Sequence, residues 1–307
     1  MSGQDAYEVC AEIRNRFQTS NIPIIYMTDR AENRDRIRIL ELGGAQYIAK
    51  PIDGEETLAR VKSRLRIRDL AKKLIKANKD LLRKEQLDEN LKAAAEIQQG
   101  LLTSAHLGVK TIDMAWRFRP CDRMGGDTFN MFGLDEDKWA IYVHDVTSHG
   151  VPSALIAVSV SQLLRPQIVF FTKRGIPNSP YYQIVPPSEG LKMLDEQYPF
   201  ERFSRFFTIT YIILNTRTGH LRYANAGHPP PVVLRKKSTI DVLRDGGTII
   251  GIGGGCVPFR EGDRELLGGD KLFIYTDGIQ EYQGKKNLLF GPDHFYSELQ
   301  RLKKIKG

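Results

Sequence analysis

Apolar and polar residues alternate along the first part of the chain in a way that predicts helices and strands in turn. Apolar positions recur at helical spacing in two segments, and short apolar runs lie between and after them. The predicted elements are a helix over 5–17, a strand over 22–27 ending at Thr28, a helix over 31–42, a strand at 47–48 and a helix over 55–65. Alternating helices and strands predict a parallel sheet.

A long helix is predicted over 66–102, because this stretch contains no proline and a single glycine. Its apolar positions follow a spacing of three and four residues, slip once, and resume: Leu70, Leu74, Ala77 and Leu81, then Leu87, Leu91 and Ala94. The spacing is typical of a coiled-coil seam with a stutter. We expect a helix that dimerises or carries a signal, and a solvent-exposed single connector is the alternative.

Three aspartates stand at or beside strand ends in the remaining sequence. Asp127 closes the motif GGD, Asp145 follows a predicted strand over 139–143, and Asp277 follows another over 271–275. Carboxylates are ligands that hard divalent cations such as Mg²⁺ and Mn²⁺ prefer, and a strand end holds them on a rigid sheet. If the three strand ends meet, they form a metal site.

The segments IPIIYMTDR and LELGGAQYIAKPID resemble the second half of a two-component receiver domain, over about residues 1–66. The resemblance implies that Thr28 and Lys50 occupy the positions that contact the acyl phosphate. The chain begins after the point where receivers place their phosphoaccepting aspartate and the earlier acidic pair. We therefore expect a half-site without a nucleophile or a Mg²⁺ cage, in a segment that serves as a scaffold.

The ordered motifs GGD, DVTSHGVPSAL, AGHPPP and FIYTDGIQEY resemble type 2C metal-dependent protein phosphatases, and among them the bacterial sporulation and stress-response serine phosphatases. The resemblance implies an α-β-β-α sandwich over 103–307, after a linker over 67–102. It also implies two Mn²⁺ or Mg²⁺ ions, bridged by Asp145 and held by Asp127, Asp277 and the carbonyl of Val146. A metal-activated water then attacks phosphorus directly.

The sequence departs from the family pattern at several positions. Asn130 stands where a second aspartate is common, and Ser148 stands where DVSGHG has its inner glycine. The family's last aspartate pair has no match before the final IKG, and Asp293 lies too early and in another context. We expect the carboxyl-terminal strand to be missing, the metal affinity to be reduced, and the chain to be a weakly active or inactive fragment of an active parent.

Composition adds limits on location and partners. The formal net charge is +8, but the stretch 61–100 alone contributes +5, as 11 Lys and Arg against 6 Asp and Glu, so a solvated helix explains most of it. Cys10, Cys121 and Cys256 have no CxxC spacing, and no signal sequence or membrane span is found. A cytoplasmic protein without a membrane or nucleic-acid partner is expected.

By resemblance, the substrate is phosphoserine or phosphothreonine on an anti-sigma-factor antagonist in a bacterial partner-switching pathway. The first alternative is a pseudophosphatase adaptor that binds a regulatory protein without chemistry. The second, a nucleic-acid-binding response regulator, requires a helix-turn-helix that the sequence lacks. His149 and His228 are expected to be structural, and the glycines of GIGGGC are expected to form a loop rather than a dinucleotide site.

Overall fold

The computed structural model describes residues 6–16, 18–19, 22–28, 46–101, 109, 111–120, 124–165, 169–236, 239–284 and 288–302. The helix expected over 31–42, Cys121 and the last five residues lie outside these ranges. The chain divides into two compact units, Met1–Glu89 and Asn90–Gly307. The domain boundaries that we predicted after residues 66 and 102 stay predictions.

The first unit contains a helix, a parallel strand pair and most of a long helix. They are α1 (Ala6–Asn15), β1 (Ile25–Thr28), β2 (Gln46–Ala49) and α3 (Gly54–Gly100). Strands β1 and β2 pair in parallel from Ile25 with Gln46 to Thr28 with Ala49, as the alternating pattern predicts. Asp53 begins α3, because its carboxylate accepts a hydrogen bond of 2.8 Å from the backbone N–H of Glu56.

Helix α3 continues without a break through the predicted linker. Its apolar seam is exposed along most of its length: Leu70, Leu74, Leu81 and Leu87 are 57%, 71%, 53% and 59% exposed. Near its carboxyl end the helix packs, where Leu91, Ala94 and the buried Ala95 contact Met124 and Ala154. This contact anchors the last turns of α3 on the second unit.

The second unit is built from two packed sheets. The larger has the order β11 (Gly246–Gly247), β8 (His220–Ala226), β7 (Phe207–Asn215), β4 (Lys138–Val146) and β3 (Thr128–Gly133), with β12 (Gly262–Glu265) also on β8. The smaller has the order β10 (Ile240–Val242), β9 (Val232–Leu234) and β13 (Lys271–Phe273), and β5 (Lys173–Gly175) and β6 (Tyr182–Ile184) form a separate hairpin. All pairs are antiparallel except β11 with β8.

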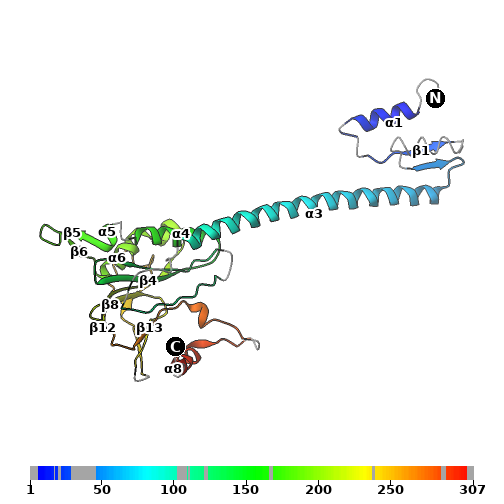
Figure 1. Ribbon diagram of the computed structural model, residues 1–307. Coiled ribbons are helices and arrows are strands. Elements are labelled where there is room, and N and C mark those ends of the chain that lie inside the picture. The colour runs from blue at the N-terminus through cyan, green and yellow to red at the C-terminus, as the bar shows by residue number, and fades with distance from the viewer. Residues whose placement is uncertain are drawn as a thin grey trace. The chain divides into compact units, whose positions relative to one another are not determined.

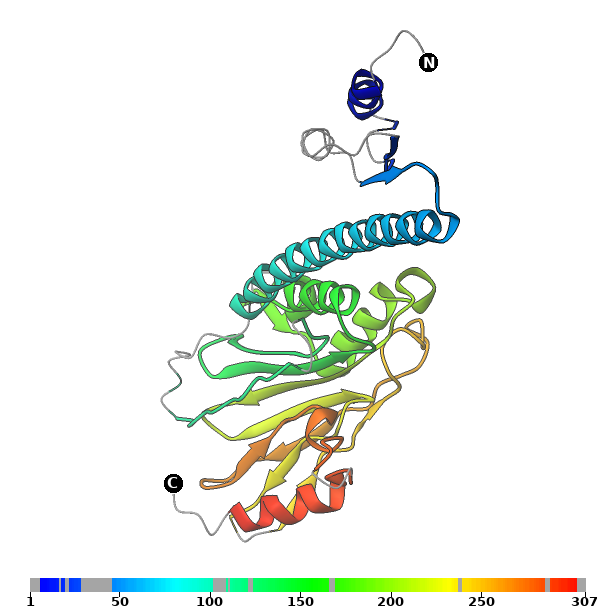
Figure 2. The same ribbon diagram turned by 90° about the vertical axis from the view of Figure 1, so that its right-hand side faces the viewer.

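Helices cover both outer faces of the two sheets (Figures 1 and 2). Helices α4 (Val151–Leu163) and α6 (Pro187–Gln197) lie on the larger sheet, with the short α5 (Val169–Thr172) and α7 (Phe200–Phe203) beside them. The short η1 (Asp277–Ile279) follows β13, and α8 (Gly291–Leu302) lies beyond the smaller sheet. The predicted α-β-β-α sandwich is confirmed.

Period-two burial on β4 explains this layering. Ala140, Tyr142, His144 and Val146 are fully buried, while the residues between them are half-buried. The first set packs beneath α4 and α6, whereas Ile141 joins the core between the sheets. A third apolar cluster, with Tyr275 and Phe295, joins the smaller sheet to α8. In the described part of the chain, no helix is both long and apolar enough to cross a bilayer.

Candidate active site

The three predicted aspartates lie on elements that come from both sheets. Thr128 of β3 pairs with His144 of β4, so Asp127 lies opposite Asp145 at the end of this strand pair. Asp277 is the first residue of η1, just after β13 of the smaller sheet. The end of the sandwich therefore brings together residues that are separated by up to 150 positions, the difference between 127 and 277.

Electrostatics show that these carboxyl groups are close neighbours. Burial raises the pKa of Asp145 to about 8, helped by a hydrogen bond with Asp127 and by the negative charges of Asp127, Asp277 and Glu281. Burial also raises the pKa of Asp277, with further contributions from the charges of Glu281 and Asp127. Because burial and like charge raise both pKa values together, the cluster concentrates negative charge at one place.

Glu281 is a further member of this acidic cluster, beyond the three aspartates that the motifs predicted. It lies four residues after Asp277, and its backbone N–H donates a hydrogen bond of 2.8 Å to the Asp277 carbonyl. After burial, the charge of the exposed Glu281 contributes to the raised pKa values of both Asp145 and Asp277. The signal was present in the motif TDGIQE, since residues four apart share one face of a helical turn.

Among the residues that the structure describes, no three His, Cys, Asp or Glu side chains are arranged to enclose a metal by themselves. The donor set nevertheless fits a hard divalent cation, because positive charge would offset the repulsion among half-buried carboxyl groups gathered at one place. Asp127, Asp145, Asp277 and the Val146 carbonyl are the groups that would hold it, with water as the remaining ligand. Their role as metal ligands stays a prediction.

Gly126 explains the glycine pair of the GGD motif. A Cβ atom at this position would lie 2.4 Å from the carbonyl oxygen of Val146, too close for any side chain. The Gly126 carbonyl also accepts a hydrogen bond of 3.4 Å from the Val146 N–H. Glycine therefore lets Asp127 approach the strand that carries Asp145.

The two departures from the family motifs have different structural outcomes. Ser148 has φ of 73°, in the left-handed region that favours the glycine of DVSGHG, so the backbone keeps a glycine conformation with a serine in it. Asn130 accepts a hydrogen bond of 2.8 Å from the N–H of Met131 through its Oδ1. Asp293 lies exposed in the first turn of α8.

Gln98, in the last turn of α3, contacts the GGD segment directly. Its side chain is 6% exposed, and Nε2 donates a hydrogen bond of 2.8 Å to the carbonyl of Gly125. The sequence signal for this contact is weak. A glutamine near the apolar seam of a helix reads the same whether its side chain is buried or solvated. The long helix is thereby fixed to a backbone group two residues from Asp127.

Two of the histidines near the site differ in burial. His149 is exposed, in the loop that follows β4. His228 is 4% exposed, and its Nδ1 forms a hydrogen bond of 2.8 Å with Oγ1 of Thr208. Burial lowers the pKa of His228 to about 4, and the Tyr275 backbone opposes part of this shift. His228 is therefore neutral at pH 7.

The predicted receiver half-site lies on the parallel strands of the first unit. Thr28 ends β1 and pairs with Ala49, the residue before Lys50. The strand ends thus hold Thr28 and Lys50 on adjacent strands at the same edge. Their part in phosphate binding stays a prediction.

Residues 135–305, more than half of the chain, match the family described as Stage II sporulation protein E (SpoIIE). The chain therefore belongs to the SpoIIE family. It is 25% identical over 211 residues to phosphoserine phosphatase RsbU of Bacillus subtilis, covering 68% of this chain and 58% of that protein. It is 24% identical over 196 residues to phosphoserine phosphatase RsbP of the same organism, covering 62% and 45%. The chain thus spans about half the length of these curated relatives.

The sandwich is similar to a solved structure, the SiaA-PP2C domain of Pseudomonas aeruginosa. The TM-score is 0.57 at 21% identity, covering 72% of this chain and 84% of that one. This likeness shows that the fold is that of type 2C phosphatase domains. A stretch of 66 residues is 39% identical to the phosphate regulon transcriptional regulatory protein PhoB of Rhizobium meliloti, covering 22% of this chain and 29% of that protein. The combination of a phosphatase-like domain with a receiver-like segment is confirmed.

Proposed function

We propose that this chain is a metal-dependent protein phosphatase that hydrolyses phosphoserine or phosphothreonine on a regulatory protein. The names of RsbU and RsbP, two phosphoserine phosphatases, support this reaction class. The observation that carries the proposal is the convergence of Asp127, Asp145 and Asp277 at one end of the sandwich, where burial and neighbouring negative charges raise the pKa values of Asp145 and Asp277.

The roles follow from position. Asp145 would hold the cations together with its neighbours, because it forms a hydrogen bond with Asp127 and senses the charge of Asp277. Asp127, Asp277 and the Val146 carbonyl would complete the protein ligands. When bound, Mn²⁺ or Mg²⁺ supplies an activated water and offsets the charge on phosphate. The bond between the water oxygen and phosphorus would form as the bond to the serine oxygen breaks, and the proton that the water loses would end on the serine oxygen.

The carboxylates also organise the site before a cation arrives. The hydrogen bond between Asp127 and Asp145 requires that the pair keep one proton, and the raised pKa of Asp145 near 8 is consistent with that. Binding of a cation would release this proton. The protein would therefore bind metal more tightly as pH rises through about 8.

We propose, at a finer level, that the substrate is an anti-sigma-factor antagonist in a bacterial partner-switching pathway, in the cytoplasm. The receiver-like segment would pass its signal through α3, which reaches the GGD segment through Gln98. The exposed leucines of α3 would form a homodimer seam. These assignments rest on the family and on the helix contact.

Hydrolysis of p-nitrophenyl phosphate by the whole chain, titrated with MnCl₂, tests the reaction class. Turnover should require manganese and should fall at least about a hundredfold in Asp145→Asn, which removes the bridging charge. Asp113→Asn, a change to an exposed carboxylate away from the cluster, is the matched control and should behave as wild type. Turnover without metal, or equal turnover in Asp145→Asn, would refute the proposal.

A pseudophosphatase adaptor is the second candidate, favoured by one observation. In the described ranges, the acidic side chains do not form a closed metal group. An adaptor would bind its phosphorylated partner with the same affinity in chelator and in MnCl₂, and it would release no phosphate. Measured phosphate release from that complex separates the two functions.

A further inference from the structure

A pocket of about 230 Å³ lies outside the acidic cluster, and the proposed metal chemistry does not use it. It is bounded by the AGHPPP loop and by the segment 243–247, and its lining residues are Asn225, Gly227, His228, Pro230, Arg244 and Gly247. Asn225 and His228 are buried at its base, while Gly227, Arg244 and Gly247 are exposed at its rim. The lining is mostly polar and carries one positive charge.

Both walls of the pocket are held in place by hydrogen bonds. The Asn225 side chain closes the AGHPPP loop, because Nδ2 donates to the His228 carbonyl at 2.8 Å and Oδ1 accepts from the His228 N–H at 2.7 Å. The Leu243 N–H donates to the Pro231 carbonyl at 2.9 Å. A Cβ atom at Gly246 would lie 1.9 Å from the Asn225 carbonyl oxygen, so the walls meet as closely as two backbones can.

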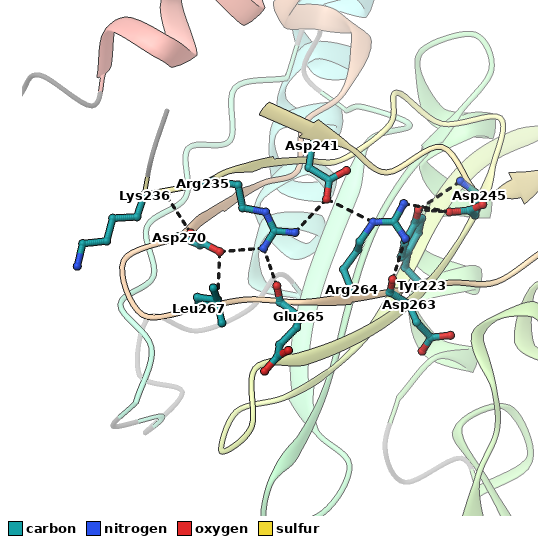
Figure 3. Close-up of polar contacts among 10 residues, drawn as sticks. All are labelled: Tyr223, Arg235, Lys236, Asp241, Asp245, Asp263, Arg264, Glu265, Leu267 and Asp270. Atoms are coloured by element: carbon teal, nitrogen blue, oxygen red, sulfur yellow. Dashed lines mark hydrogen bonds and ion pairs between the residues drawn. The ribbon is translucent and has the colours of Figure 1, made fainter. Parts of the chain in front are cut away.

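Arg244 projects from a segment that is fixed on either side of it. Leu243 is fully buried between the sheets. The Asp245 carboxylate accepts a hydrogen bond of 2.5 Å from the Tyr223 hydroxyl and lies 3.7 Å from Arg264 (Figure 3). The backbone that carries Arg244 is therefore preorganised, and little entropy is lost there when a ligand binds.

Two neighbouring arginines already have carboxylate partners. Arg235 contacts Asp241 and Asp270, and Arg264 contacts Asp241 and Asp245, in one continuous network (Figure 3). Within the described part of the chain, no carboxylate pairs with the exposed Arg244. Its guanidinium thus presents donors for an oxyanion from outside the chain.

The pocket lies close to the aspartates but not on top of them. Asp145 pairs with Thr208 on the adjacent strand, and Thr208 contacts His228 of the pocket at 2.8 Å. Two strand spacings put the pocket about 10 Å from Asp145. An extended peptide covers that distance in about three residues, so one substrate segment can reach both places.

We propose that Arg244 binds a carboxylate on the substrate protein, carried by an Asp or Glu about three residues from the phosphorylated serine or threonine. The pocket then acts as a specificity subsite, and this assignment rests on the proposed function. The bidentate geometry of guanidinium with carboxylate favours an acidic side chain over a neutral one. The phosphoryl group itself would lie at the aspartates, outside this pocket.

The test compares two fluorescently labelled phosphoserine peptides, one with glutamate about three residues to either side of phosphoserine and one with glutamine there. Dissociation constants are measured by anisotropy for the whole chain. Wild type should prefer the glutamate peptide by about three- to tenfold, and Arg244→Gln should remove this preference. Arg244→Lys should retain part of it. Arg260→Gln is the matched control, since Arg260 is exposed and its backbone N–H bonds the carbonyl of Gly246.

Turnover of p-nitrophenyl phosphate separates the failures. We expect the same manganese-dependent turnover in Arg244→Gln as in wild type, because this substrate has no flanking residue. An equal glutamate preference in wild type and Arg244→Gln overturns the subsite. A loss of p-nitrophenyl phosphate turnover in Arg244→Gln also overturns it, because it would place Arg244 on the phosphoryl group. Absence of turnover in wild type refutes the proposed function alone, because the peptide affinities still decide the role of Arg244.

Discussion

Gln98 and Gly125 are joined by a hydrogen bond of 2.8 Å, in which the side-chain amide of α3 donates to the carbonyl two residues before Asp127. Gln98→Met keeps the size of the side chain but leaves this buried carbonyl without a partner. We expect a loss of about 1–3 kcal/mol in unfolding free energy. Manganese-dependent turnover should fall about tenfold, since small misplacements of a ligand are costly.

The exposed neighbour Gln99 provides the matched control for this contact. Gln99→Met changes the same residue type on the same helical turn and should leave both stability and turnover unchanged. Urea unfolding and steady-state kinetics measure the two effects. Equal turnover in Gln98→Met and wild type would show that this hydrogen bond fixes the end of α3 but does not position Asp127 for catalysis.

Asp145→Asn should stabilise the metal-free protein while it abolishes metal binding. Because the pKa of Asp145 is raised to about 8 in the folded state, its contribution to stability is lost as pH rises from about 4 towards 8. A neutral amide removes this penalty. At pH 8 with chelator, we expect a rise in Tm of about 3–8 °C by differential scanning calorimetry. A lower Tm for Asp145→Asn than for Asp113→Asn would contradict the claim that the charge of Asp145 destabilises the metal-free protein.

Acid should destabilise the protein through its buried histidines. Burial lowers the pKa of His144 to about 3, with a further contribution from the charge of His228, whose own pKa is lowered to about 4. The stability these neutral rings contribute is present above about pH 6.5 and is lost as pH falls towards 4. Each ring costs about 1.4 kcal/mol per pH unit in this window.

His228→Gln measures one of these two contributions. Between about pH 6.5 and 5, its unfolding free energy should fall by about 2 kcal/mol less than that of wild type. Gln99→Met, which changes an exposed residue without an ionisable group, should follow the wild-type pH dependence. Parallel curves for His228→Gln and wild type would show that protonation of this ring does not limit acid stability.

Ser148→Gly should stabilise the loop after Asp145. Ser148 has φ of 73°, where a Cβ atom costs about 1–2 kcal/mol, and glycine removes that cost. Part of the gain is offset because glycine loses more backbone entropy than serine on folding. We expect a net gain of up to about 1 kcal/mol in thermal unfolding. Ser148→Ala keeps the Cβ atom and should show no gain. A loss of stability in Ser148→Gly would mean that the serine hydroxyl holds the loop.

The fold and the acidic residues could be predicted because their signals are local. Strand-end aspartates such as Asp145 and Asp277 are readable from short apolar runs that end in a carboxylate, and the ordered motifs predicted the sandwich that the structure confirms. The structure also brings Asp127 to Asp145 through the pairing of β3 with β4. The metal role of these residues stays a prediction.

The contacts that were not predicted depend on chain segments far apart in the sequence. Gln98 meets a carbonyl 27 residues away, which helical periodicity cannot show. Arg244 is distinguished from Arg235 and Arg264 only by lacking a carboxylate among the described residues, and that depends on which strands meet. The left-handed conformation of Ser148 follows from the turn between β4 and α4, and no side-chain pattern shows it.

Binding of Mn²⁺ tests the central claim most directly, because it requires neither a substrate nor a complete catalytic cycle. Electron paramagnetic resonance would measure free Mn²⁺ in a titration of the whole chain at about pH 8, beside Asp145→Asn and Asp113→Asn. We predict saturable binding by wild type and by Asp113→Asn, and a loss of at least about tenfold in affinity in Asp145→Asn. Equal binding by all three proteins would show that Asp127, Asp145 and Asp277 do not form a metal centre.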